Sequence, residues 1–155
     1  MQLSSPAFFH EQEIPARFTC EGENRSPPLE WSDVPEGTQS FALVVDDPDA
    51  PDPAAPKRVF VHWVLFDLPA DKRALSEGLA EGLPEGAGIG RNDWDDASYG
   101  GPCPPIGRHR YVHKLYALDT TLALERPTKA ELEDAMQGHI LAKTELVGTY
   151  AKSRG

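Results

Sequence analysis

Proline and glycine interrupt this chain so often that few stretches remain long enough for a regular helix. The 15 prolines and 13 glycines are 28 of 155 residues, about 18% where ~12% is usual. They fall in clusters and follow no fixed period, which excludes a collagen-like chain. The pattern predicts short strands joined by many turns.

Size and charge limit the classes of function. A chain of 155 residues has the length of one domain, so we expect a single domain over residues 1–155. The net charge is -10, and residues 1–100 carry 19 of the 25 acidic side chains. Such a field repels anionic polymers and acidic lipid surfaces, so we expect no nucleic-acid partner. Only residues 101–155 carry more basic than acidic groups, so we expect a small-anion site to draw on them.

Membrane insertion and export are also not expected. The longest apolar run, Phe41–Val45, is far below the ~18 residues that span a bilayer. Met1–Leu3 opens no signal-like segment, so we expect a cytoplasmic protein. Cys20 and Cys103 are the only cysteines, and without an export signal two free thiols are favoured over a disulfide.

The first half of the chain contains two strong strand patterns. Ser40–Asp46 holds five consecutive apolar residues and predicts a central strand covered on both faces. In Val59–Leu68, simple alternation places two sets of side chains on opposite faces: Phe60, His62, Val64 and Phe66 against Val61, Trp63 and Leu65. A weaker pattern predicts a short strand at Arg17–Cys20, and turn residues occupy 21–28 before Leu29–Trp31. The run Asp47–Pro56 has four prolines and predicts a rigid loop.

The second half predicts two strands and a helix between them. The strands are Tyr111–Leu118 and Glu145–Tyr150. A capping box in Pro127–Glu131 starts the helix, which we expect to end near Gly138; its predicted apolar stripe is Leu132, Ala135, Met136 and His139 or Ile140. Together the elements predict an antiparallel sandwich with a helix packed at its edge.

Residues 69–108 show no convincing strand, although 74–79 could form a turn of helix. Long ordered segments of this kind are commonly functional. Unusual residues concentrate in 46–51, 61–63 and 100–111, all near strand ends. Prolines hold such loops in place before binding, and glycines let a ligand approach main-chain amides. These are features of an anion pocket.

These segments, in this order, resemble the phosphatidylethanolamine-binding protein family, also called Raf kinase inhibitor-like proteins, and specifically its bacterial branch. The resemblance rests on the Asp-Pro-Asp-Ala-Pro run at 47–51, Gly-Pro-Cys-Pro-Pro at 101–105, His-Arg-Tyr at 109–111 and the closing 145–150 segment. It implies a mainly β, Greek-key-like antiparallel sandwich with one or two short helices. It also implies a cavity for phosphate, acetate or a phospholipid headgroup, a binding role rather than catalysis, and a cis bond at Ala50–Pro51.

The resemblance also assigns roles to individual positions. Asp47, His62 and His109 correspond to the ligand-binding side chains, and Gly101 and Pro102 to the pocket wall. Surrounding positions are Asp49, Cys103 and Tyr111. The chain departs from the eukaryotic pattern at Val61 and Cys103, and we expect no C-terminal helix after Tyr150.

Other interpretations remain open. The competing class is an enzyme, using Cys103 and His109 for acyl transfer or Asp47 and His62 for hydrolysis. A third is a protein-interaction module. His62 could instead be a satisfied core histidine, and the two aspartates could bond their own loop amides.

We expect neither metal nor cofactor, since no histidine spacing fits a ligand set. A homodimer and a protein partner are left open. We expect Arg108 and Arg110 to be solvated rim residues. If both pocket histidines face the ligand, anion binding should strengthen as pH falls from about 8 to 6.

Overall fold

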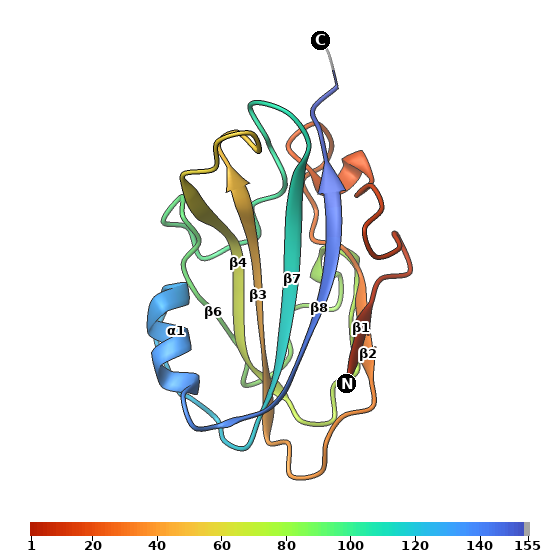
Figure 1. The fold of residues 1–155 in the computed structure, drawn as a ribbon. Coiled ribbons are helices and arrows are strands. Elements are labelled where there is room, and N and C mark those ends of the chain that lie inside the picture. The colour runs from red at the N-terminus through yellow and green to blue at the C-terminus, as the bar shows by residue number, and fades with distance from the viewer. Residues whose placement is uncertain (154–155) are drawn as a thin grey trace.

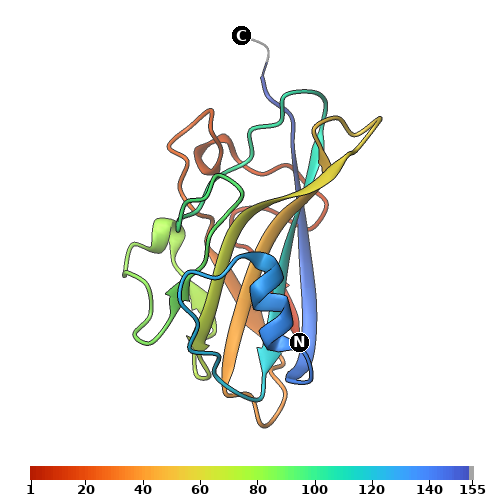
Figure 2. The ribbon, with the colours of Figure 1, turned by 90° about the vertical axis from the view of Figure 1, so that its left-hand side faces the viewer.

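A computed structural model of the protein describes residues 1–153, which form two antiparallel β-sheets (Figures 1 and 2). The smaller sheet contains, in order, β1 (Gln2–Ser4), β2 (Leu29–Ser32) and β5 (Ala74–Leu75). The larger contains β6 (Gly88–Ile89), β4 (Arg58–Pro69), β3 (Ser40–Ala50), β7 (His109–Leu118) and β8 (Ile140–Tyr150). Because β7 returns to lie beside β3 after the long segment that follows β4, the path is Greek-key-like. The predicted mainly β sandwich is confirmed.

Apolar side chains pack on both faces of the larger sheet. One cluster fills the space between the two sheets and includes Trp31, Phe41 and Trp63. The other lies between the larger sheet and helix α1 (Lys129–Met136) and includes Val64 and Leu132. The five-residue apolar run in β3 is therefore covered on both faces, as predicted.

Helix α1 begins at the predicted capping box. The Thr128 side chain accepts a hydrogen bond from the Glu131 amide, and the Glu131 carboxylate accepts one from the Thr128 amide. Leu132 and Met136 are buried, but His139 and Ile140 are exposed. The helix ends at Met136, and Gly138 turns the chain with φ of 80° into β8, so the apolar stripe is shorter than expected.

Simple alternation along β4 was wrong at one residue. Val45 pairs with Trp63, but Asp46 pairs with Val61, so His62 is an extra residue in a β-bulge. As a result Val61 joins the cluster under α1, whereas Trp63 belongs to the cluster between the sheets. The bulge lets His62 contact Tyr111 at the end of the sandwich.

Three predicted segments differ in the structure. Arg17–Cys20 is not a strand, because bonds from Phe18 and Thr19 to carbonyls three residues earlier close a 3-10 turn at Ala16–Phe18. The predicted loop at Asp47–Pro56 is partly strand, since pairing with β4 extends β3 to Ala50. Residues 74–79 divide into β5 and a 3-10 turn at Glu77–Leu79.

The termini add two observations. Residues 151–153 form neither helix nor strand, whereas 154–155 lie outside the described residues. No helix within residues 1–153 has the length and apolar character to cross a membrane.

Candidate functional site

One end of the sandwich holds a cavity of about 580 Å³. The end of β3, the start of β4 and the start of β7 meet there, at the top of Figure 1. The lining side chains are Asp47, Ala50, Pro51, Lys57, Arg58, Phe60, His62, Trp94, Cys103, Pro104, Pro105, His109 and Tyr111. The three side chains predicted to bind a ligand are therefore brought together. The peptide bond before Pro51 is cis, as predicted.

Asp47 and His109 form a buried pair across β3 and β7. His109 Nδ1 lies 2.6 Å from Asp47 Oδ2, and the two side chains are 1% and 5% exposed. The second carboxylate oxygen accepts the Asp49 amide at 2.7 Å. Asp47 thus accepts a hydrogen bond from an amide of its own loop and also holds His109 in place.

The other nitrogen of His109 is also occupied. Nε2 lies 2.8 Å from the Ile106 carbonyl oxygen, which can only accept a hydrogen bond. Since both ring nitrogens face acceptors, both bonds form only when both nitrogens carry hydrogen. Neither ring nitrogen of His109 is therefore free to bond a ligand.

His62 is held in a different way. Its Nδ1 lies 2.7 Å from the Gly100 carbonyl oxygen, so Nδ1 carries the hydrogen. Burial lowers the pKa of the His62 imidazole, and the Gly100 carbonyl and nearby carboxylates, Asp47 among them, offset only part of this effect. Nε2 has no hydrogen-bond partner among residues 1–153 and is not enclosed by protein. At neutral pH the unprotonated Nε2 of His62 therefore offers a lone pair to the cavity.

Tyr111 lines the cavity itself and does not merely support it. Its ring contacts that of His62 at 5.2 Å between centroids, and in the described part of the chain its hydroxyl has no hydrogen-bond partner. Burial raises the pKa of the Tyr111 phenol well above its usual value, so the hydroxyl stays protonated and can donate.

The sequence interpretation missed several residues at the cavity mouth. Lys57 and Arg58 line it, and Arg58 lies 2.9 Å from Asp93 and over the Phe60 ring. Trp94 also lines the cavity and packs edge-on against Phe60 at 4.7 Å between ring centroids. The sequence signal for Lys57 and Arg58 was their position as a basic pair directly after the proline-rich run 47–56.

Gly101 and Pro102 do not form the expected wall. The wall consists of Cys103, Pro104 and Pro105. Gly101 instead packs against the 18–24 segment, where an added Cβ would lie 2.3 Å from Asn24 Oδ1, and its amide donates to that same oxygen. Glycine is needed here for close packing between two loops and not for approach to a ligand.

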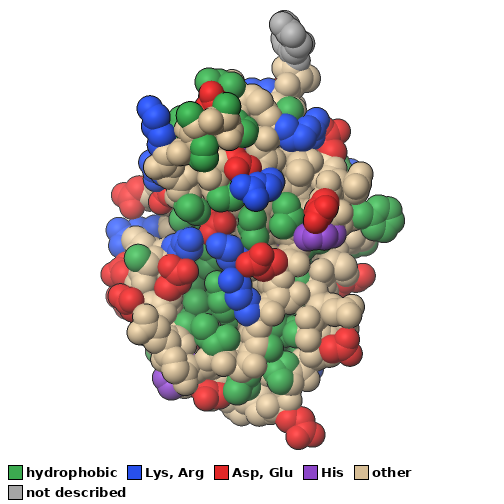
Figure 3. All heavy atoms as spheres, viewed as in Figure 1, with side chains coloured by type: hydrophobic (Ala, Val, Ile, Leu, Met, Phe, Trp, Pro, Cys, Tyr) green, Lys and Arg blue, Asp and Glu red, His purple; other side chains and the backbone are tan. Residues whose placement is uncertain are grey.

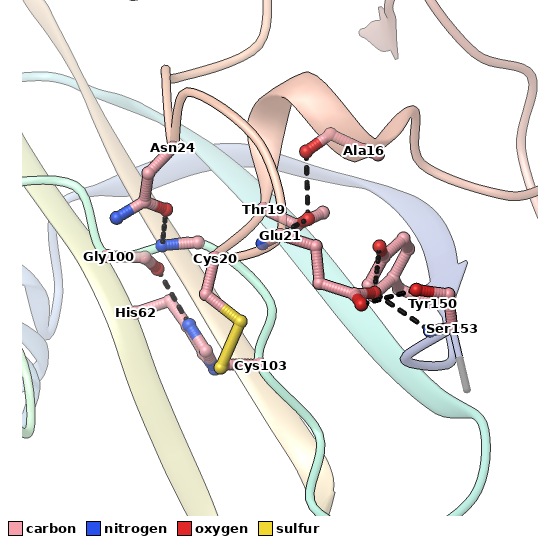
Figure 4. The surroundings of a disulfide bond; sticks show 11 residues. Ala16, Thr19, Cys20, Glu21, Asn24, His62, Gly100, Cys103, Tyr150 and Ser153 are labelled. Atoms are coloured by element: carbon pink, nitrogen blue, oxygen red, sulfur yellow. Dashed lines mark hydrogen bonds between the residues drawn. A yellow bond between two sulfur atoms is a disulfide. The ribbon is translucent and has the colours of Figure 1, made fainter. Parts of the chain in front are cut away.

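Cys20 and Cys103 form a disulfide, so the expectation of two free thiols was wrong (Figure 4). The loops that carry them are packed together, and the Cys20 amide also donates to the Pro102 carbonyl. His62 points toward this disulfide in Figure 4. A disulfide sulfur presents no thiolate, so Cys103 and His109 do not form the pair required for acyl transfer.

Three further residues singled out from the sequence, Asp49, Arg108 and Arg110, do not line the cavity. Asp49 accepts hydrogen bonds from the Arg110 guanidinium, which lower the pKa of this carboxyl. The Arg110 side chain is 59% exposed, and that of Arg108 is 52% exposed and pairs with Glu13, as rim positions would be. Residues 1–153 contain no cluster of three His, Cys, Asp or Glu side chains suited to a metal ion.

Comparisons with known proteins extend over almost the whole chain. The family model described as phosphatidylethanolamine-binding protein matches residues 4–151. The UPF0098 protein of the archaeon Methanothermobacter thermautotrophicus is 46% identical over 98% of this chain and 99% of its own. That of Chlamydia trachomatis is 42% identical over 98% and 99%. With relatives in both archaea and bacteria, the narrower bacterial branch stays a prediction.

Solved structures agree. The crystal structure of a putative phosphatidylethanolamine-binding protein homologue from Chlamydia trachomatis has a TM-score of 0.89 at 40% identity, covering 98% of this chain and 97% of that one. Escherichia coli YbcL, described as a new member of the mammalian family, has a TM-score of 0.87 at 33% identity, with 98% of both chains covered. None of these names assigns an enzymatic activity. The chain belongs to the phosphatidylethanolamine-binding protein family.

Proposed function

We propose that the cavity binds a small phosphorylated or carboxylated anion and that the protein acts as a binding module. The observation that carries this proposal is the meeting of Asp47, His62, His109 and Tyr111 in one cavity of about 580 Å³. A cavity of this size suits a small molecule.

The distribution of charge supports an anion. Lys57 and Arg58 give the mouth positive charge, and the Tyr111 hydroxyl is a free donor deeper inside. The aromatic rings of Phe60 and Trp94 supply apolar contact for the remainder of the ligand. Both oxygens of Asp47 are already engaged, one by His109 and one by the Asp49 amide.

Calorimetric titration of phosphoethanolamine, with tryptophan fluorescence as a second readout because Trp94 lines the cavity, tests the proposal. Tyr111→Phe should weaken binding about tenfold, the value of ~1.5 kcal/mol for one hydrogen bond to a charged group. Tyr116→Phe is the matched control, since Tyr116 lies on the same strand but in the cluster under α1.

The absence of both heat and a fluorescence change at millimolar ligand would contradict the proposal. Equal weakening by Tyr111→Phe and Tyr116→Phe would show that the substitutions act through the fold. Either result would favour a protein-interaction module whose surface loops, not its cavity, carry the function.

A further inference from the structure

We infer that this cavity recognises a phosphoryl group that still carries a proton, and so binds phosphate monoesters and free phosphate as protonated monoanions while rejecting phosphate diesters and sulfate. The inference rests on the proposed function and defines its ligand class. The selecting group is Nε2 of His62, a lone pair directed into a cavity otherwise suited to an anion.

The hydrogen bond to Gly100 determines which nitrogen of His62 can accept. A carbonyl oxygen cannot donate, so Nδ1 keeps its hydrogen at 2.7 Å from that oxygen, and Nε2 keeps a lone pair while the ring is neutral. The ring is 4% exposed, and its burial lowers its pKa below the usual value, which favours the neutral form at pH 7.

Other groups inside the cavity do not supply the missing donors. Both oxygens of Asp47 are acceptors, and both nitrogens of His109 are already bonded. Pro104 and Pro105 in the wall have no amide hydrogen, and the Gly101 amide donates to Asn24. The interior therefore presents several acceptors beside the Tyr111 hydroxyl, and the indole N–H of Trp94 is a further uncharged side-chain donor in the lining.

A protonated phosphate matches this arrangement. Its P–OH donates to His62 Nε2, one unprotonated oxygen accepts from the Tyr111 hydroxyl, and the negative charge faces Lys57 and Arg58 at the mouth. Sulfate and diesters carry no proton, so one of their oxygens would face the nitrogen lone pair. A site that requires a hydroxyl donor discriminates strongly against an analogue without one, because its buried acceptor is left unpaired.

Several titratable groups surround His62 and affect its charge. Carboxylates on β3 and on the loop before β7 favour the imidazolium of His62, and His62 in turn lowers the pKa of His113. The groups that act on His62 or share its cavity are Asp46, Asp47, Lys57, Arg58, Asp93, His109, Tyr111 and His113. Their combined effect leaves burial dominant, so the pKa of His62 stays below its usual value.

The rival donor is an ammonium, which could point inward toward Asp47. Two probes that share this ammonium separate the alternatives: phosphoethanolamine is a monoester, whereas glycerophosphoethanolamine is the diester of a phospholipid headgroup. At pH 6 the monoester should bind at least tenfold more tightly. Inorganic phosphate should exceed sulfate by a similar factor.

The pH profile gives a second measurement on the unmodified protein. The second pKa of a phosphate monoester is ~6, so its protonated fraction falls roughly fiftyfold between pH 6 and 8. Phosphoethanolamine affinity should fall by about that factor over this range. The weak binding of sulfate should not change.

Variants then assign the selection to His62. In His62→Gln the amide can rotate to donate, so sulfate and phosphate should bind within about threefold of each other. Tyr111→Phe should weaken both anions and keep their ratio. The ratio is compared within each variant, so a general loss of affinity does not hide the result.

Three outcomes separate this inference from the proposed function. If no probe binds, the proposed function itself fails. If the diester or sulfate binds as well as the monoester or phosphate, the selection is overturned while anion binding stands. If glycerophosphoethanolamine binds and inorganic phosphate does not, the ammonium of the ligand donates to the lone pair of His62 Nε2. That outcome also overturns the selection for a protonated phosphate.

Discussion

Removing the Cys20–Cys103 cross-link should destabilise the protein by close to the full value expected for a long loop. The two cysteines are 83 residues apart, and closing a loop of that length in the unfolded chain corresponds to about 4.5 kcal/mol at 25 °C on the chain-entropy model. Cys20 is exposed and Cys103 half-buried, so serine hydroxyls at both positions can reach water. The difference in unfolding free energy between the wild type and the Cys20→Ser/Cys103→Ser variant should therefore reflect the loss of the cross-link alone, without a cost for burying the serine hydroxyls.

The measurement is urea or thermal unfolding of the oxidised protein beside this double variant. For a chain of this size about 4.5 kcal/mol corresponds to a midpoint lower by roughly 10 °C or more. Each single variant should lose as much as the double variant. A dithiol reductant should lower the wild-type midpoint to that of the double variant and leave the latter unchanged.

A double variant within about 1 kcal/mol of the oxidised wild type would refute this reasoning. It would show that the hydrogen bonds between the two loops, Gly101 to Asn24 and Cys20 to Pro102, hold them together without the cross-link. Titration of thiols in the unfolded wild type checks that the disulfide was formed at the start.

Three further predictions concern stability. Burial lowers the pKa of His113 to about 4 from 6.5; the unfolded chain then binds more protons between these values, so stability should fall by up to about 3 kcal/mol from pH 6.5 to 4, and urea unfolding of His113→Leu should show a flatter pH profile. Asp46→Asn should cost about 2 to 4 kcal/mol in urea unfolding because two lysines lose a fully buried partner, whereas Lys143→Ala, which removes an exposed pair, should cost under about 0.5 kcal/mol. Gly101→Ala should destabilise by about 1 to 3 kcal/mol in thermal unfolding, since its Cβ would meet Asn24 and backbone atoms within 3.0 Å. Unchanged unfolding in Asp46→Asn or Gly101→Ala, or an unchanged pH profile in His113→Leu, would contradict the corresponding reasoning.

Much of the fold could be predicted because local patterns determine it. The apolar run in β3, the alternation in β8 and the capping box of α1 each depend on residues close in sequence. The extension of β3 to Ala50 could not be predicted in this way. It depends on pairing with Phe60 and Arg58 across the hairpin, and a run with four prolines between 47 and 56 gives no local strand signal.

The bulge at His62 shows the same limit at the candidate site. Period-two alternation assumes an uninterrupted ladder, and one extra residue reverses the faces beyond it. The bulge places His62 near Tyr111 and Trp94, which come from distant segments. The disulfide was missed for a related reason: residues 83 apart meet only because two loops pack at the same end of the sandwich.

The cavity also uses charge in a way that the sequence distribution does not reveal. Consecutive side chains of β3 point to opposite faces, so Asp46 meets Lys114 under α1 whereas Asp47 meets His109 in the cavity. Lys114 and His109 both come from β7, in the part of the chain with excess positive charge. On the front face of the larger sheet, blue and red side chains accordingly lie intermixed (Figure 3).

This pairing changes which residues can attract an anion. The positive charge of residues 101–155 was expected to supply the site, but on β7 it neutralises buried aspartates. The cationic side chains that line the cavity are Lys57 and Arg58, from the acidic part of the chain. Substituting them should therefore slow association and reduce its salt dependence, whereas His109→Ala should act mainly by leaving Asp47 as an unpaired buried charge. A weaker anion complex in His109→Ala would then reflect repulsion from Asp47 and not the loss of a direct contact.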